Sequence, residues 1–160
     1  MSEEPVLRPA ARILVLDAMD RVLLFRYPAL ETHEAPWATP GGGLEPGETH
    51  REAALRELAE EMGLVGIELG PEIWFREEVF RWGGRLLRQQ ERFFLARVTS
   101  YELPASVRAV HERDGISRYS WWSLDELEAT SENIFPTRLA ALLRALLAEG
   151  PRGEPFDIGV

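Results

Sequence analysis

Three glutamates lie close together in one stretch of this 160-residue chain. Glu57, Glu60 and Glu61 stand at the spacings i, i+3 and i+4, which place them on one side of a helix. Like charges at these spacings repel by about 0.2–0.5 kcal/mol per pair in an isolated helix. A solvated acidic surface would account for such a cluster. A bound divalent cation would account for it as well, because hard cations such as Mg²⁺ take oxygen ligands.

A run of glycines precedes the acidic stretch and bears on the choice between these two interpretations. Gly41, Gly42 and Gly43 follow Pro40, and residues 46–47 (Pro-Gly) predict a second turn. Glycines let the backbone turn sharply and let an ion or ligand approach main-chain atoms closely. A loop that exposes carbonyl oxygens beside a carboxylate cluster is a suitable source of ligands for a hard cation.

The helix that carries the glutamates has clear end signals. Thr49 and Glu52 form the pattern of a capping box, and Gly63 is a natural residue just beyond the helix end. Apolar residues at helical spacing are expected to face the core, opposite the glutamates: Leu55, Leu58, Ala59 and Met62. The helix is therefore expected to be anchored by one face and to present acids on the other.

The composition excludes several kinds of chemistry. All 18 basic residues are arginine, and the chain has no cysteine, so lysine Schiff bases, thiol nucleophiles, disulfides and cysteine zinc sites are ruled out. The net charge of −9 gives no general attraction to a nucleic-acid polymer or an anionic membrane, so we expect neither as a partner. Without a signal peptide or a membrane-spanning apolar run, we expect a cytoplasmic protein.

The remaining patterns predict one domain over residues 1–160, with its core at about 6–148 and a loose tail at about 150–160. Strands are expected at 11–16, 22–27, 37–39, 67–80, 86–98 and 117–122, with a hairpin turn at 83–84. Further helices are expected at 123–129 and 136–148, and a loop at 100–114. This mixture favours a mixed sheet between helical layers.

The central stretch, residues 42–64, resembles the Nudix box, G-x5-E-x7-R-E-U-x-E-E-x-G-U, in which U is a bulky aliphatic residue. Every specified position fits: Gly42, Glu48, Arg56, Glu57, Leu58, Glu60, Glu61, Gly63 and Leu64. Trp37, Pro40 and residues 121–127 are also similar to common features of that superfamily. The resemblance covers roughly residues 6–148, and its specificity is concentrated in the box.

The resemblance implies an α/β/α sandwich around a central mixed β-sheet. It also implies an enzyme, dependent on Mg²⁺ or Mn²⁺, that hydrolyses a diphosphate bond in a small molecule. A nucleoside diphosphate linked to another group is the default substrate, and a homodimer is compatible with the sequence. The alternative is a Nudix-like nucleotide-binding or regulatory module that has lost the chemistry.

Metal ligands carry over from the resemblance residue by residue. Glu57 and Glu61 would be the principal ligands, Glu60 a further or water-mediated ligand, and the Gly41 carbonyl another. Metal ions would neutralise the diphosphate and activate a water molecule. The intact acids favour an active enzyme over the binding module.

The general base is left open between several acids. Glu57 is one candidate. Family members often use an acid from a late loop instead, which here spans residues 109–117, where Glu112 is the first choice and Asp114 the second. An ordinary surface acid is an equally good interpretation of either residue.

Several arginines and histidines complete the set of candidates. The resemblance pairs Arg56 with Glu48, which would tie the helix to its loop. Arg26 and Arg76 are candidate phosphate contacts, although a surface arginine and a charged hairpin edge are the simpler interpretations. The histidines lack metal-ligand spacing, and each is most simply a surface or loop residue: His33, His50 and His111.

Overall fold

The structure is a computed structural model that describes residues 2–29 and 34–159. His33, one of the three histidines, lies outside the described residues. Within the described part, nine strands form one sheet in the order β8-β3-β2-β1-β6-β5-β9, while β4 pairs with β1 and β7 with β2. Parallel pairs (β1 with β6, β5 with β9 and β3 with β8) occur beside antiparallel ones, so the sheet is mixed.

The elements follow one another along the chain as short strands and helices. The strands are β1 Val6–Leu16, β2 Val22–Arg26, β3 Trp37–Ala38, β4 Gly41–Gly43, β5 Glu72–Trp82, β6 Arg85–Arg97, β7 Arg118–Trp122, β8 Ile134–Phe135 and β9 Phe156–Asp157. The helices are α1 His50–Met62, the 3-10 turn η1 Ala105–Val107, α2 Arg108–Asp114, α3 Leu124–Ala129 and α4 Leu139–Glu149.

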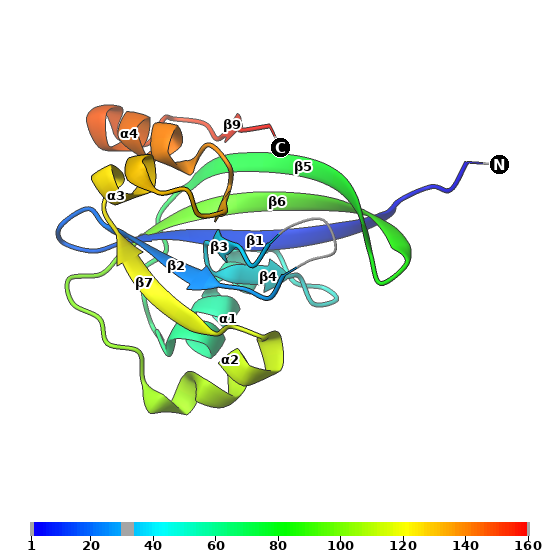
Figure 1. Ribbon diagram of the computed structural model, residues 1–160, viewed down its shortest axis with the longest axis horizontal. Coiled ribbons are helices and arrows are strands. Elements are labelled where there is room, and N and C mark those ends of the chain that lie inside the picture. Colours follow the sequence, from blue (N-terminus) through cyan, green and yellow to red (C-terminus); the bar gives the residue numbers. More distant parts are fainter. Residues whose placement is uncertain (1, 30–33, 160) are drawn as a thin grey trace.

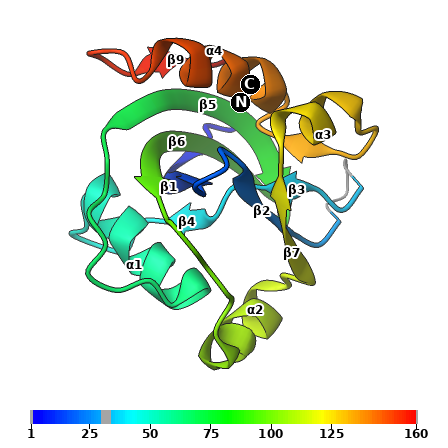
Figure 2. The ribbon, with the colours of Figure 1, turned by 90° about the vertical axis from the view of Figure 1, so that its left-hand side faces the viewer.

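The helices cover the two faces of the sheet in separate layers. Figures 1 and 2 show α1 and α2 on one side and α3 and α4 on the other. A buried cluster fills each interface: one joins Leu58 and Met62 of α1 to the sheet, and the other joins Leu139 and Leu143 of α4 to it. The predicted α/β/α sandwich with a central mixed sheet is confirmed.

Strand β1 connects the two layers. Its side chains alternate, so that Ile13 and Val15 enter the cluster under α1 while Leu14 and Leu16 enter the cluster under α4. β1 begins at Val6, earlier than the expected residue 11, because its first residues pair with β6 in parallel. This pairing runs the full length of β1 and makes it the scaffold against which the glycine strand β4 is placed.

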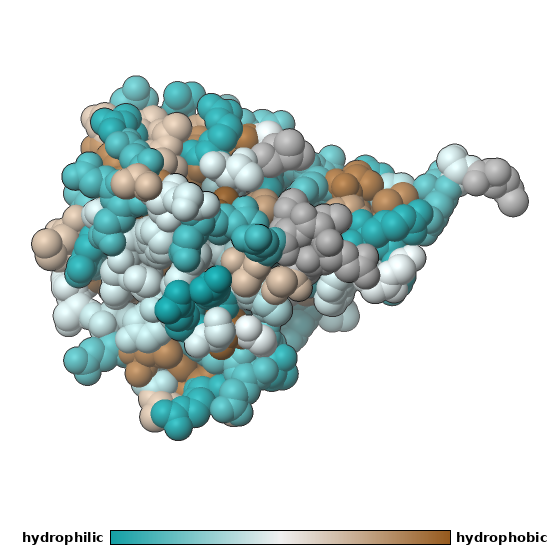
Figure 3. Space-filling model, in the orientation of Figure 1, coloured by the Kyte–Doolittle hydropathy of each residue, from teal (hydrophilic) through white to brown (hydrophobic). Residues whose placement is uncertain are grey.

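The long hairpin of β5 and β6 has the predicted turn. Gly83 and Gly84 both have positive φ, +58° and +78°, which fits a tight two-residue hairpin turn. The hairpin and the first residues of β1 project beyond the helical layers (Figure 1). Figure 3 shows hydrophobic surface over this end, where Val6, Leu7 and Val79 are exposed.

Two expectations about the second half of the chain are wrong. Residues 100–114 are not all loop: η1 and α2 occupy 105–114, and α2 ends where Gly115 adopts a left-handed conformation. The tail is not loose. β9 pairs with β5, and Ile158 is buried, with its backbone N–H donating to the Phe75 carbonyl oxygen at 3.0 Å. The side chain of Ile158 packs in the buried cluster on the α4 side of the sheet. The sequence of the tail is too short to show a periodicity that would predict this burial.

Helix α4 also begins later than expected, at Leu139. None of the helices in the described residues is both long enough and apolar enough to cross a membrane.

Candidate active site

Helix α1 is held at both ends as its sequence predicts. The Thr49 hydroxyl accepts from the Glu52 backbone N–H, the Glu52 side chain accepts from the Thr49 N–H, and Gly63 is left-handed with φ of +70°. The expected apolar face is only partly correct, because Leu55 is 38% exposed while Ala53 and Ala54 are buried. The buried face is therefore rotated toward the glutamates.

Glu57 and Glu61 lie on the buried face of α1, not on an open acidic surface. Their exposed fractions are only 6% and 2%. Burial, and after it the negative charge of Glu57, raises the pKa of the Glu61 carboxyl well above its usual range. Two buried carboxylates that lie close together repel each other, which is unfavourable unless a cation or a proton compensates their charge.

The glycine strand β4 makes room for these carboxylates. The Gly41 backbone N–H donates to Glu61 Oε2 at 3.2 Å. A Cβ atom on Gly42 would lie 2.6 Å from Glu57 Oε1, closer than real contacts allow. A side chain at position 42 would therefore displace the Glu57 carboxylate, because this acid of α1 packs directly against the β4 backbone.

Arg56 ties α1 to the loop, as the resemblance implies. Its Nε and Nη2 atoms donate to the two Glu48 carboxylate oxygens at 2.8 and 2.9 Å. Nη2 also donates to the Gly43 carbonyl, and Nη1 donates to Glu57 and Glu60. A guanidinium has five N–H groups, so these bonds use all of them. Arg56 therefore positions the acids and has no donor left for a substrate.

A second arginine, Arg12 of β1, lies on the other side of Gly41. Its Nη1 donates to the Gly41 carbonyl oxygen at 3.3 Å, and its Nε donates to Glu91 Oε2 at 2.6 Å. Glu91 also accepts from Arg76, which is buried and lies 3.5 Å from Glu78. Although burial opposes ionisation, the guanidinium groups of Arg12 and Arg76 lower the pKa of Glu91 to about 2.

Arg12 and Glu91 cannot be recognised as partners from the sequence, because their pairing depends on the register of β1 with β4 and β6. Arg76, one of the candidate phosphate contacts, is not a solvated hairpin arginine. The structure places it in this buried ion network, because its strand partner across the β5–β6 pair is Glu91.

The late acids lie on α2, not on a loop. Glu112 is exposed, and Asp114 accepts from the Arg113 guanidinium at 3.0 Å. Between them and α1 stands His111, which is buried with its Nε2 atom 2.7 Å from the Glu61 carbonyl oxygen. The prediction that His111 is a surface or loop residue is wrong, since His111 is buried and joins α2 to α1.

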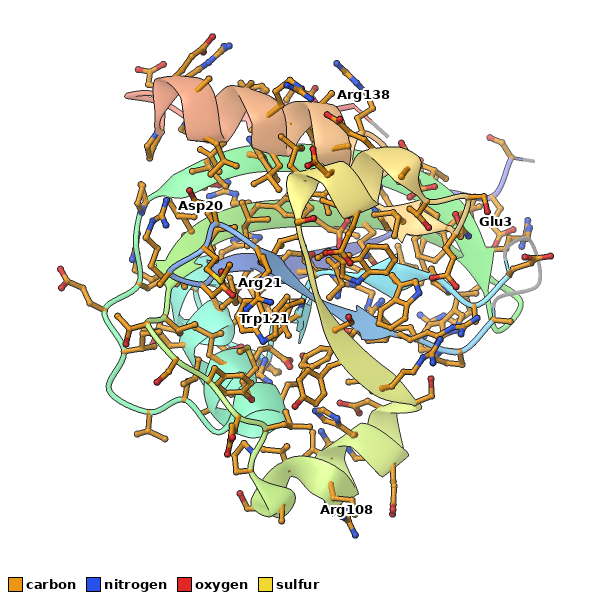
Figure 4. The ribbon with its side chains drawn as sticks, turned by 60° about the vertical axis from the view of Figure 1, so that its left-hand side comes forward. Glu3, Asp20, Arg21, Arg108, Trp121 and Arg138 are labelled. Carbon is orange, nitrogen blue, oxygen red and sulfur yellow. The ribbon has the colours of Figure 1, made fainter. Side chains whose placement is uncertain are left out.

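Arg26 lies at the end of β2, next to another arginine. The guanidinium groups of Arg26 and Arg118 lie 5.9 and 5.3 Å from the centre of the Trp37 ring. Trp121 lies on β7, the strand that pairs with β2. Figure 4 shows that it points toward the α1 layer, where it packs against Tyr101, and that Arg108 projects outward from α2. The structure thus brings Arg26 to the buried Trp37 ring, and no bond joins it to Glu57 or Glu61 among the described residues.

The described residues do not contain a preformed group of three or more His, Cys, Asp or Glu side chains close enough to hold a metal. What they contain is a buried pair, Glu57 and Glu61, with the Gly41 backbone between it and Arg12. Glu60 is half-buried and bonded to Arg56. His50 is half-buried, and its Nε2 has no partner in the described part.

Comparison with solved structures places the fold in a known class. The MutT protein from Methanosarcina mazei Go1 superposes with a TM-score of 0.67 at 20% identity, covering 94% of this chain and 100% of that one. A MutT NUDIX hydrolase from Burkholderia pseudomallei gives 0.60 at 22% identity, covering 89% and 98%. These likenesses establish the fold.

Sequence comparison then gives the family. The NUDIX domain matches residues 6–143, so the chain belongs to the NUDIX domain family. A protein from Sphingopyxis alaskensis called RNA pyrophosphohydrolase is 30% identical over 155 residues, 90% of this chain and 93% of that protein. One of the same name from Erythrobacter litoralis is 37% identical over 102 residues, 57% of this chain and 61% of that protein. The predicted family and its hydrolase class are confirmed: the chain is a Nudix-type hydrolase of diphosphate bonds.

Proposed function

We propose that this hydrolase cleaves its diphosphate substrate at the buried face of α1, with Glu57 and Glu61 as the principal ligands of a divalent cation. The observation that carries the proposal is the burial of both carboxylates side by side, with burial and the charge of Glu57 raising the pKa of Glu61. A divalent cation relieves this unfavourable arrangement because it compensates both charges. The donor set, all oxygen, suits Mg²⁺ or Mn²⁺.

Neighbouring residues would complete the site. Gly41 is joined to the pair by its N–H bond to Glu61, and its carbonyl, which also accepts from Arg12, would supply a further oxygen; Glu60 would supply one directly or through water. The bound cation would neutralise the diphosphate and lower the pKa of an attacking water. Arg56 holds Glu57 and Glu60 in place, so its contribution to catalysis is to orient them.

A carboxylate must also accept the proton of the attacking water. Glu112, on the exposed side of α2, is our first choice, Asp114 the second, and Glu57 itself the third. The Asp114 carboxylate already accepts a hydrogen bond from the Arg113 guanidinium, so it has less free acceptor capacity for the proton of water than the exposed Glu112. A comparison of Glu112→Gln with Asp114→Asn locates the base: if neither slows the reaction, the base lies elsewhere.

The substrate is proposed at two levels. A nucleoside diphosphate linked to another group, a small molecule, is the first candidate. The name shared by the relatives makes RNA a second one, although the net charge of −9 disfavours a polyanionic chain. An RNA has a diphosphate bond at a 5′ end that carries more than one phosphate, so only that end would enter the site. The cytoplasmic location and the homodimer stay predictions.

Glu57→Gln tests the proposed site. We expect turnover to fall on the order of 10³-fold, because the neutral glutamine amide would bind the divalent cation much more weakly than the Glu57 carboxylate. The assay should screen nucleoside triphosphates, sugar nucleotides, dinucleoside polyphosphates, ADP-ribose and a 5′-triphosphorylated RNA oligonucleotide, each with Mg²⁺ and with Mn²⁺. Glu68→Gln, an exposed glutamate beyond the helix, is the control. Unchanged phosphate release by Glu57→Gln would show that the cation is held elsewhere. Absence of turnover by the unaltered protein on every substrate would favour the binding-module alternative.

A further inference from the structure

Arg12 is only partly used by the contacts that hold it in place. Its Nε donates to Glu91, and its Nη1 donates to the carbonyl oxygens of Thr39 and Gly41, both at 3.3 Å. A guanidinium carries five N–H groups. The two on Nη2 have no acceptor among residues 2–29 and 34–159, and the side chain is 19% exposed. Arg12 therefore has donors that a ligand can reach.

Two neighbouring arginines, Arg56 and Arg76, do not have such donors. Arg56 uses all five of its N–H groups on Glu48, Gly43, Glu57 and Glu60. Arg76 has an unpaired Nη1 atom, but that atom is buried out of reach of a ligand. Arg12 thus combines an anchored position with accessible donors on the Gly41 side of the site. Arg8, which is bonded to Gln89 through Nη1, lies against Gly43 instead.

The position of Arg12 is fixed relative to the carboxylates. Arg12 and Glu61 bind the same residue, Gly41, one through its carbonyl oxygen and the other through its N–H. The Tyr27 ring lies behind the guanidinium, with its centre 6.0 Å from Cζ. Glu91 holds Arg12 in one orientation through Nε, so little side-chain freedom is lost when Nη2 binds a ligand, and because Glu91 is shared with Arg76 the two arginines keep a net positive charge.

We propose that Arg12 binds a phosphoryl oxygen of the diphosphate substrate through its Nη2 group. Guanidinium groups pair strongly with phosphate oxygens through charge-assisted hydrogen bonds. A diphosphate that approaches Glu57, Glu60 and Glu61 is repelled by their negative charges. Arg12 supplies a fixed positive charge on the other side of Gly41. This inference rests on the proposed function, because it assumes that the substrate phosphates lie at the Glu57–Glu61 pair.

A purely structural role for Arg12 predicts something different. If Arg12 only held the Gly41 carbonyl in place, its loss would disturb the oxygen set of the cation site, and cation and phosphate binding would weaken together. If Arg12 binds phosphate, its loss removes a positive charge that repels the cation and attracts the phosphate. Cation binding is then retained or strengthened while phosphate binding weakens. The two roles differ in the direction of one measurement.

Calorimetry with two probes separates these roles. Mg²⁺ alone measures the cation site, and methylenediphosphonate added with saturating Mg²⁺ measures phosphate binding without turnover. For Arg12→Gln we expect methylenediphosphonate affinity to fall about 10- to 100-fold, with Mg²⁺ affinity equal to or above that of the unaltered protein. Arg12→Lys keeps the charge without the fork and should lie between. Arg97→Gln, which removes an exposed arginine paired with Asp20, should change neither affinity.

Three outcomes decide the matter against the proposal. Unchanged methylenediphosphonate affinity in Arg12→Gln overturns it, and so does a parallel loss of Mg²⁺ and methylenediphosphonate binding in a folded variant. If Arg12→Gln does not fold, Arg12→Lys takes its place, and unaltered phosphate affinity there overturns the proposal. A failure of the proposed function is recognised separately: Glu57→Gln then keeps full Mg²⁺ binding and turnover, whatever Arg12 does.

Discussion

At the scale of single residues, the sequence predicted that the three acids share one helix, but it did not reveal their surroundings. The spacing of Glu57, Glu60 and Glu61 predicted one helix side, and all three lie on α1. Their burial differs, however, because β4 covers Glu57 and Glu61 and leaves Glu60 half-open. The difference separates the two proposed principal ligands from the third acid, which Arg56 holds.

Glu91 provides a prediction for the dependence of stability on pH. Its pKa is about 2 in the folded protein, against a usual value of 4.5. A carboxyl with a lowered pKa stabilises the folded state above about pH 4.5 and loses this contribution as the pH falls toward 2. We expect Glu91→Gln to lower the free energy of unfolding at pH 7 on the order of 3 kcal/mol, and to flatten the loss of stability in acid.

Urea unfolding between pH 2 and 7 measures this effect. Glu78→Gln is the matched control, since Glu78 lies on the adjacent strand and pairs with Arg76 more loosely, at 3.5 Å, in a more exposed position. Identical pH profiles for Glu91→Gln and the unaltered protein would mean that the two arginines do not stabilise the Glu91 carboxylate.

At the scale of elements, the site depends on the packing of strand β4 between β1 and α1. The sequence predicted a glycine loop, and the structure shows a short strand that pairs Gly41 with Arg12 and Gly43 with Ala10. The glycines are required for two different reasons. Gly42 leaves space for the Glu57 carboxylate, whereas Gly41 lies against the backbone of β1.

Gly41→Ala tests the tightness of this packing. A Cβ atom at Gly41 would lie 2.1 Å from the Ala11 carbonyl oxygen, and φ is +146°. The Cβ position is fixed by the Gly41 backbone and the atom that it meets is a backbone oxygen, so the clash cannot be relieved without separating β4 from β1. We expect the free energy of unfolding to fall by about 2 kcal/mol or more, together with Mg²⁺ affinity. Thermal unfolding and calorimetry measure the two.

Gly47→Ala is the control for this substitution. Gly47 also has positive φ, +80°, but a Cβ atom there would meet nothing within 4 Å. It should therefore cost only the strain of the backbone, about 1 kcal/mol. Equal losses for the two variants would argue that strain alone, not the approach of β4 to β1, makes glycine necessary at position 41.

At the scale of the whole molecule, the chain end completes the sandwich. The sequence suggested a loose tail after residue 150, yet β9 extends the sheet beyond β5 and Ile158 fills the α4-side cluster. The tail and the proposed cation site lie on different layers, since α1 covers the opposite face (Figure 2). Changes in the tail are therefore expected to act on stability and not on the cation site.

Ile158→Ala measures the contribution of the tail. Removal of a buried isoleucine side chain is expected to lower the free energy of unfolding by about 2–4 kcal/mol, with Mg²⁺ affinity unchanged. Val65→Ala, at an exposed valine, is the control and should have little effect. If Ile158→Ala unfolds at the same urea concentration as the unaltered protein, the tail contributes no packing energy and the expectation of a loose tail is restored.

Local sequence was sufficient wherever a structural feature depends on neighbours in the chain. The capping box at Thr49, the left-handed Gly63, the tight turn at residues 83–84 and the helical spacing of the glutamates are all of this kind. Each is set by backbone preferences and side chains within a few residues. For the same reason the Nudix box, a local motif, was sufficient to predict the family, the fold and the type of reaction.

Tertiary structure alone decided which groups meet. Arg12 lies 79 residues from Glu91, and His111 lies 50 residues from Glu61, so no local pattern joins them. The same holds for Ile158, whose partners come from β5 and α4. Burial and pairing across the sheet are sums over distant contacts, and these contacts decided that two glutamates are enclosed, that Arg76 is part of a buried network and that Arg12 faces the site.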